Sequence, residues 1–247
     1  SGAAGGGPSD PCDSGYHTGS AQWVPSSKAP ARLSKGVGMS RYIGPSCKLC
    51  RREGMKLFLK GIKCTTPKCP VSRRNFPPGS REQARRTKTS DYGLQLREKQ
   101  KIRRTYGVLE RPFRRLFSVA SRSKGITGEA LLQLLERRLD NVVYRLGFAA
   151  SRANAREMVR HGFVRVNNRK VDLPSYLIRQ GDEVEIQARE TTLTHFKEVR
   201  ETLKDREIPA WIKADPKELK GSCVRLPERS DLTTPVKEQL VVELYSK

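Results

Sequence analysis

The sequence predicts an α+β fold made of two lobes, a mostly helical lobe stapled by a metal ion and a small helix-plus-hairpin module. Three observations lead to this prediction. Four of the six cysteines lie within residues 47–69, a density typical of a small metal site. Apolar residues recur at helical spacing over residues 127–146. A short β-rich run with the turn pair Asn167-Asn168 then predicts a β-hairpin.

Charge is the strongest restriction on what the chain binds. The 247 residues include 49 Lys and Arg against 26 Asp and Glu, a formal net charge of +23. Residues 39–128 hold 24 basic and 5 acidic residues, so a net +19 lies in this block. Such a surface is typical of nucleic-acid binding, because phosphate contacts release counterions. No stretch reaches the ~18 consecutive apolar residues of a membrane span, and we expect neither a membrane nor a small-molecule partner.

The first segment, residues 1–38, is rich in Gly, Ala, Ser and Pro and has no hydrophobic period. Burial there cannot offset the loss of chain entropy, so we expect a disordered extension. It would be a tag or the product of a misassigned start, with Met39 as the natural beginning. An organelle transit peptide is disfavoured by Asp10 and Asp13. The sparse, clustered cysteines indicate a reducing compartment, and we expect the cytoplasm.

The cysteine pattern is Cys47-x2-Cys50-x13-Cys64-x4-Cys69. Two closely spaced thiol pairs joined by a short loop can close a tetrahedral thiolate site, so we expect one structural zinc ion. Four protein ligands would leave no open position for water, which disfavours a catalytic zinc. Four free thiols in a chain that has lost its zinc are the alternative.

Helix signals follow along the rest of the helical lobe, which we place at residues 39–136. Asp91 is expected to cap a helix that runs to Arg104, and Glu110 precedes a second helix that ends near residue 125. Thr127 is expected to cap one long core helix that continues to about residue 146.

The module is placed at residues 137–190. Ser151 is expected to cap a helix to His161, Gly162 to stop it in the left-handed region, and the hairpin to follow. A last strand is expected at residues 183–187. The C-terminal segment, residues 191–247, is expected to pack back on the helical lobe through residues 236–244, with Cys223 as a buried small hydrophobic residue.

Arginines on the module helix form one stripe, because Arg152, Arg156 and Arg160 recur four residues apart. An ordinary solvated face is the alternative, but the basic residues around the hairpin favour RNA contact. Such contacts would fix the register on phosphates, and specificity would come from RNA shape. The residues expected to contact phosphate are Arg41, Arg51, Arg52, Arg73, Arg74, Arg85, Arg86, Arg103, Arg104, Arg152, Arg156 and Arg169.

Four stretches carry a family resemblance. They are Met39-Ser40-Arg41-Tyr42-Ile43-Gly44-Pro45, the cysteine quartet, Ser90-Asp91-Tyr92 with the helix after it, and the run from Arg138-Leu139-Asp140-Asn141 to Gly147-Phe148. Over residues 39–247 the chain resembles the small-subunit ribosomal protein S-four family, in its zinc-bearing bacterial form. Residues 137 to about 190 resemble the S-four-type RNA-binding module, or alpha-L motif, which some tRNA synthetases and pseudouridine synthases also carry.

The resemblance implies a structural constituent of the small ribosomal subunit and not an enzyme. It implies an early-binding assembly protein that grips the 5′ domain of small-subunit rRNA beside neighbouring ribosomal proteins. It further implies a position near the mRNA entry channel and an influence on translational accuracy. The expected location is therefore the ribosome in the cytoplasm.

Three other functions compete with this interpretation. A pseudouridine synthase is suggested by Arg138-Leu139-Asp140, but the triplet lies inside the expected helix of the binding module, and Asp140 is expected to pair with a neighbouring Arg. A hydrolase would need a nucleophile beside His161 or His195, and none is placed there. A zinc-dependent DNA-binding regulator lacks a recognition helix with a dimer pattern. Preference for structured RNA over duplex DNA in a salt series would distinguish these classes.

Overall fold

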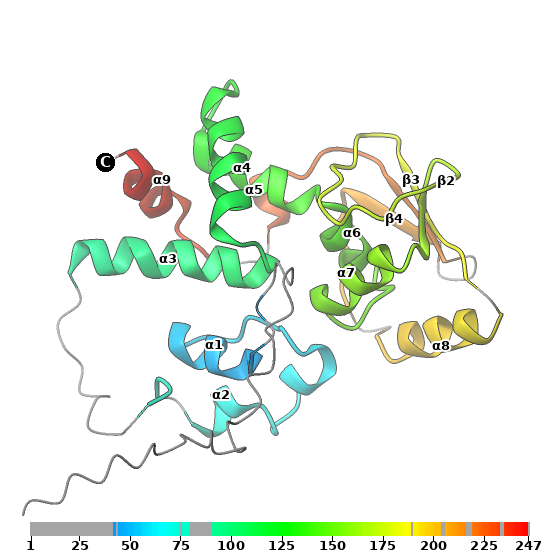
Figure 1. Ribbon diagram of the computed structural model, residues 1–247, viewed down its shortest axis with the longest axis horizontal. Coiled ribbons are helices and arrows are strands. Elements are labelled where there is room, and N and C mark those ends of the chain that lie inside the picture. The colour runs from blue at the N-terminus through cyan, green and yellow to red at the C-terminus, as the bar shows by residue number, and fades with distance from the viewer. Residues whose placement is uncertain are drawn as a thin grey trace, which may run out of the picture. The chain divides into compact units, whose positions relative to one another are not determined.

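The computed structural model describes residues 42, 44–74, 76–79, 90–188, 190–203, 206–215, 219–232 and 235–246 (Figure 1). All of them belong to one contact unit, residues 39–247. The expected extension 1–38 lies outside the described residues, as do three of the arginines expected to contact phosphate, Arg41, Arg85 and Arg86.

The helical lobe begins with α1 (Ser46–Glu53), a short 3-10 turn (Gly61–Cys64) and α2 (Pro70–Arg73). Three longer helices follow and form its core, namely α3 (Asp91–Tyr106), α4 (Glu110–Arg122) and α5 (Thr127–Glu136). Their apolar faces meet through fully buried Ile102, Phe113, Leu131 and Leu135. The helices at 91–104 and from 110 are therefore confirmed. The expected caps were displaced by one residue.

The displaced cap of α3 has a local reason, whereas the start of α5 has no side-chain cap. The Ser90 hydroxyl oxygen accepts a 3.2 Å hydrogen bond from the Gly93 N–H, so Ser90 caps α3. Asp91 is the first helical residue, where its negative charge faces the positive end of the helix dipole. At α5 the residue before the helix is Ile126, and no side chain caps that end.

The single long helix expected over residues 127–146 is wrong. The chain leaves the helix after α5, and α6 (Leu139–Arg145) starts anew. Arg138 is extended between them and forms an isolated antiparallel bridge with Leu177. On either side, the Leu139 N–H donates to the Tyr176 carbonyl at 2.8 Å, and the Ile178 N–H donates to the Arg137 carbonyl at 2.9 Å. Pairing with this distant segment replaces the helical bonds, although the apolar periodicity continues across the break.

The module follows its prediction closely. In α7 (Arg152–Arg160) the Ser151 hydroxyl accepts from the Asn154 N–H at 3.2 Å, and Gly162 has a φ of 73° just after the helix. The strands β1 (Val164–Val166) and β2 (Arg169–Lys170) pair antiparallel. Asn167 and Asn168 connect them with φ of 49° and 63°, the positive values of a type I′ turn. The last expected strand is β3 (Glu183–Ile186).

The C-terminal segment packs on both lobes. After α8 (Glu190–Glu201), the strands β4 (Ile212–Asp215) and β5 (Lys220–Cys223) enlarge the hairpin sheet, whose strand order is β2-β1-β3-β5-β4. Cys223 is buried in the core beneath this sheet, as expected. A short 3-10 turn (Arg229–Asp231) leads to α9 (Glu238–Ser246), which packs on α3 and α5 of the helical lobe (Figure 1). The sequence indicated that this segment packs on the helical lobe, but not that it adds strands to the sheet.

Candidate nucleic-acid interface

The four cysteines expected to bind metal lie in the first part of the helical lobe. Cys50, Cys64 and Cys69 are buried, Cys47 is half-buried, and none forms a disulfide. Burial raises the pKa of the Cys50 and Cys64 thiols, and the electrostatic influence of the other cysteines adds to it. Backbone N–H groups face two of the sulfurs, and the Lys60 N–H donates to Cys64 Sγ at 3.4 Å. Across the described residues, no three or more His, Cys, Asp or Glu side chains are grouped closely enough to hold a metal.

A buried carboxylate joins the cysteine region to α3. The side chain of Glu53, at the end of α1, is 0% exposed and pairs through one oxygen with Arg104 and, at 3.3 Å, with Arg97. The second oxygen, Oε2, is buried without a hydrogen-bond partner. Burial raises the pKa of Glu53 despite these arginines, and burial lowers the pKa of Arg104. The pair fixes the direction of the Arg104 guanidinium more than it stabilises the fold.

A second buried carboxylate, Glu136, lies at the break between α5 and α6. The Tyr106 hydroxyl donates to its Oε1 at 2.7 Å, and the Asn141 amide donates to its Oε2 at 2.5 Å. Arg145 binds both oxygens, at 2.7 and 3.1 Å. Burial alone would raise the pKa of Glu136, but Arg145 and these hydrogen bonds outweigh it and lower the pKa. Since Tyr106 ends α3, this network connects three helices at one ionised group.

Arg152 on α7 is held by the same cluster. Its Nε donates to the Asn141 side-chain oxygen at 2.8 Å. Its guanidinium carbon lies 4.4 Å from the centre of the Tyr144 ring and 5.1 Å from that of Tyr106, a double cation–π contact. Arg152 therefore has a fixed position between the two lobes, which the sequence stripe alone did not indicate.

Asp140 orients the next arginine of the stripe. Arg138 donates two hydrogen bonds to its carboxylate, of 2.8 and 3.2 Å, and both side chains are buried. Arg156 approaches the same carboxylate at 3.2 Å. The Arg-Leu-Asp triplet is therefore a structural ion pair, which confirms the expectation that Asp140 pairs with a neighbouring Arg.

The described arginines that were expected to contact phosphate divide into two groups. Arg52, Arg73, Arg74 and Arg169 are exposed. Arg51, Arg103, Arg104, Arg152 and Arg156 are partly buried and bonded within the chain; Arg51, for example, donates to the Phe76 carbonyl at 3.0 Å. The first group can reach a phosphate backbone without rearrangement, whereas the second is preorganised by protein partners.

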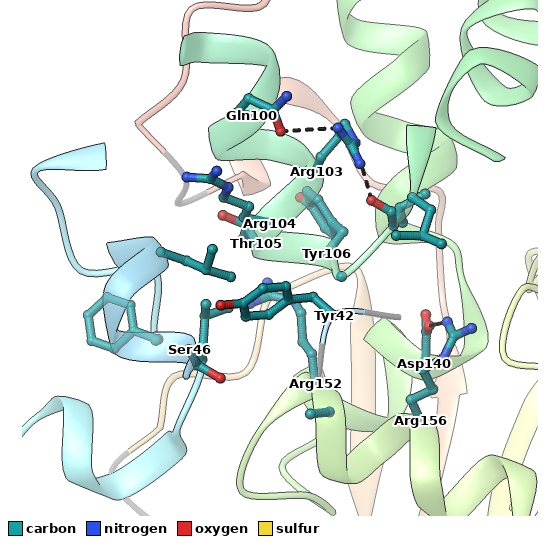
Figure 2. A pocket seen from close by; sticks show the side chains of 17 residues that line it. Tyr42, Ser46, Gln100, Arg103, Arg104, Thr105, Tyr106, Asp140, Arg152 and Arg156 are labelled. Atoms are coloured by element: carbon teal, nitrogen blue, oxygen red, sulfur yellow. Dashed lines mark hydrogen bonds and ion pairs between the residues drawn. The ribbon is translucent and has the colours of Figure 1, made fainter. Parts of the chain in front are cut away.

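Several arginines of the second group border a cavity of about 310 Å³ that the sequence did not reveal. Figure 2 shows Tyr42 lying across it, with Arg104 and Tyr106 of α3 on one side and Arg152 and Arg156 of α7 on the other. The cavity is built from segments distant in sequence, and the only sequence signal was the concentration of Arg and aromatic residues in each segment.

Among the described helices, none is both long and apolar enough to cross a bilayer.

Comparison with known protein families gives two matches that follow each other along the chain. Residues 41–136 match the ribosomal protein S4/S9 N-terminal domain, and residues 137–184 match the S4 domain. The two matched segments meet at the break between α5 and α6. Together they cover more than half of the chain.

Individual relatives match over their whole length. The chain is 57% identical over 211 residues to small ribosomal subunit protein uS4A of Symbiobacterium thermophilum, which is 85% of this chain and 100% of that protein. It is 54% identical over 209 residues to uS4 of Thermus thermophilus, again 85% of this chain and 100% of the relative. For uS4 of Caldicellulosiruptor bescii the identity is 56% over 209 residues, with the same coverage.

Proposed function

The chain belongs to the uS4 family of small ribosomal subunit proteins, and from that premise we propose that it is a structural constituent of the small subunit that binds rRNA through both of its lobes. The observation that carries the proposal is the 54–57% identity over the full length of the relatives. Membership of a structural, non-enzymatic family agrees with the expectation that the chain is not an enzyme. The expected resemblance to this family is confirmed.

The binding mechanism follows from the charge and the fixed arginines. Exposed Arg52, Arg73, Arg74 and Arg169 supply phosphate contacts whose strength depends on salt. The guanidinium groups held by Glu53, Glu110 and Asp140 supply contacts of defined geometry. Fixed contacts select a particular RNA shape, because an RNA with a different fold cannot present phosphates at the same points.

The finer parts of the proposal concern position in the cell and in the particle. The rRNA target would be the 5′ domain, where the protein would bind early in assembly beside other small-subunit proteins. The protein would lie near the mRNA entry channel and would therefore influence translational accuracy. The ribosome of the cytoplasm would be its location. These statements are carried by the family resemblance alone.

Reconstitution tests the function most directly. Small subunits would be assembled from Thermus thermophilus rRNA and small-subunit proteins with uS4 omitted, and this chain would then be added. We expect particles that sediment as complete subunits and contain the added chain in equal amount to rRNA. Particles that remain incomplete, with the chain left unbound, would contradict the proposal. A charge-matched basic protein outside this family is the control.

For the cysteine quartet we propose one structural zinc ion, held by Cys47, Cys50, Cys64 and Cys69. The donor chemistry suits zinc, since the chain supplies two thiol pairs that act on one another electrostatically and backbone N–H groups directed at Cys50 and Cys64; binding would require the described thiols to draw closer together than they lie here. The metal would stabilise deprotonated thiols that burial otherwise keeps protonated. Its role would be to fix the loop between α1 and α2 and thus the exposed arginines of the two flanking helices, Arg52 in α1 and Arg73 and Arg74 at the end of α2.

Substitution Cys50→Ser tests this proposal, with Cys223→Ser as the matched control because Cys223 is a buried cysteine of the other lobe. We expect one zinc per chain in the parent and in Cys223→Ser by elemental analysis, and loss of zinc in Cys50→Ser. Amide hydrogen exchange should accelerate in residues 46–73 of Cys50→Ser and stay unchanged in α7. A parent chain purified with added zinc that holds none, or Cys50→Ser with full zinc, would contradict it.

A further inference from the structure

The walls of the cavity in Figure 2 are mainly apolar and aromatic. Its apolar lining includes Leu49 of α1, Leu59 after it, and Val108 and Leu109 beyond α3. Two aromatic side chains, Tyr42 and Phe58, also line it although they are 52% and 45% exposed. A volume of about 310 Å³ is at the small end of ligand sites, which run from roughly 300 to 1,000 Å³. The space therefore suits one flat apolar group.

The rim of the cavity is cationic and fixed. Arg103 binds Glu110 at 2.9 Å, Arg104 binds Glu53, and Arg156 binds Asp140 at 3.2 Å. These three arginine side chains remain 17%, 22% and 19% exposed, so part of each reaches solvent beside the cavity, which Asp140 also lines. A ligand that combines a flat apolar part with negative charge on both sides of it is complementary to this arrangement.

Local features set the positions of both exposed aromatic side chains. Phe58 has a φ of 51°, a strained conformation for a bulky residue that is kept only where the surroundings enforce it. The Tyr42 ring folds against Gly44, where a Cβ would lie 2.5 Å from the Tyr42 hydroxyl oxygen. A side chain at position 44 would therefore displace the Tyr42 ring. The strained backbone of Phe58 and the close packing of Tyr42 on Gly44 are the two observations that point to a use for these exposed rings.

We propose that this cavity receives one unstacked nucleobase of rRNA, stacked on Tyr42 or Phe58, while the phosphates on either side of it contact Arg103, Arg104 and Arg156. The proposal rests on the proposed function and names a binding subsite within it. Unpaired bases of loops and bulges are the parts of RNA that proteins hold between aromatic and arginine side chains, whereas paired bases are already stacked. The cavity thus gives this protein a way to read one nucleotide in addition to overall shape.

Binding of the full chain to small-subunit rRNA 5′-domain transcript tests the proposal in a salt series. The variants are Tyr42→Leu, which removes the aromatic face, Tyr42→Phe, which keeps it, and Gly44→Ala, which displaces the ring. Tyr92→Leu is the matched control, since Tyr92 lies on α3 away from the cavity and is 59% exposed. Phe58→Leu removes the second aromatic face.

We expect Tyr42→Leu or Phe58→Leu to weaken binding by roughly 5- to 150-fold, the range for loss of one stacked base. The dependence on salt should not change, because no charge is removed. Tyr42→Phe and Tyr92→Leu should bind like the parent, and Gly44→Ala should weaken binding. Dimethyl sulfate should find at least one unpaired base protected by the parent chain and reactive again with the weakened variant.

Two results would overturn the proposal. One contradicts only the nucleobase subsite, and the other also contradicts the proposed function. If the parent binds the 5′-domain transcript selectively but Tyr42→Leu and Phe58→Leu match Tyr92→Leu, the nucleobase subsite is wrong and the proposed function stands. If the parent itself shows no preference over an unrelated structured RNA of equal length, both fail. Thermal melts of each variant, expected to match the parent because both side chains are exposed, separate loss of binding from loss of fold.

Discussion

Replacing Glu136 by glutamine should be among the most damaging conservative substitutions in the chain. Glu136 is 0% exposed and neutralises Arg145, which is itself only 12% exposed, through bonds of 2.7 and 3.1 Å. Glutamine keeps the shape but leaves the arginine charge buried without a counter-charge, which costs about 3–5 kcal/mol. Since a whole domain is stable by only about 5–15 kcal/mol, much of the native stability would be lost.

Urea unfolding followed by circular dichroism measures the effect. With a slope of about 2 kcal/mol per molar urea, the midpoint should fall by roughly 2 M. Glu129→Gln is the control, because Glu129 is exposed on the same helix; its effect should stay within about 0.5 kcal/mol. The double variant Glu136→Gln with Arg145→Met should lose less than the sum of the single changes. A loss below about 1 kcal/mol for Glu136→Gln would refute the reasoning.

Three further predictions concern stability. Because the pKa of folded Glu136 is lowered, its contribution to stability is present above the ordinary glutamate pKa of about 4.3 and is lost as the pH falls through the folded value. The free energy of unfolding, measured against pH, should decline in that range. An equal decline in Glu136→Gln would contradict this assignment. Ser151→Ala should cost about 1 kcal/mol in urea unfolding through loss of the α7 cap, and a cost equal to zero would show that the observed hydrogen bond to the Asn154 N–H contributes nothing. Gly221→Ala should destabilise by about 1–3 kcal/mol, since its Cβ would lie 2.4 Å from Leu146 Cδ2; an unchanged melting temperature would mean that the sheet and α6 can separate freely.

Local signals in the sequence predicted the elements that depend on local chemistry. The α7 cap, the glycine stop after it and the Asn167-Asn168 turn are all confirmed because each is fixed by residues within four positions of one another. The helices α3 and α4 follow from apolar spacing in the same way. The cap of α3 moved from Asp91 to Ser90 because two adjacent residue types both favour that position.

Elements fixed by distant partners could not be predicted in this way. The helix break at Arg138 depends on hydrogen bonds to residues 176–178, which no local pattern reveals. The strands β4 and β5 are short; β5 takes its register from β3, with Val184 opposite Gly221, and among the described strands β4 pairs with β5 alone. The cavity is lined by residues of α1, α3 and α7 and of the segments beside them, so the roles proposed for Tyr42 and Phe58 depend on bringing these segments together.

The arginine stripe shows the same limit for the functional residues. The spacing of Arg152 and Arg156 correctly placed them on one helix. It did not show that Arg152 is enclosed between Tyr106 and Tyr144, or that Arg156 is oriented by Asp140. Charge counts indicated that the chain binds nucleic acid. Which arginines are fixed, and which are free to adapt to phosphate, depends on the groups within the chain that bind each guanidinium.

The most direct test of the central claim is the affinity of the full chain for small-subunit rRNA 5′-domain transcript, compared with an unrelated structured RNA of equal length over a salt series. We predict tight, selective binding to the 5′ domain that persists at moderate salt, because fixed arginines add shape selection to the general attraction of a +23 chain. Equal affinity for both RNAs, falling together as salt rises, would contradict the account and leave only a general polycation.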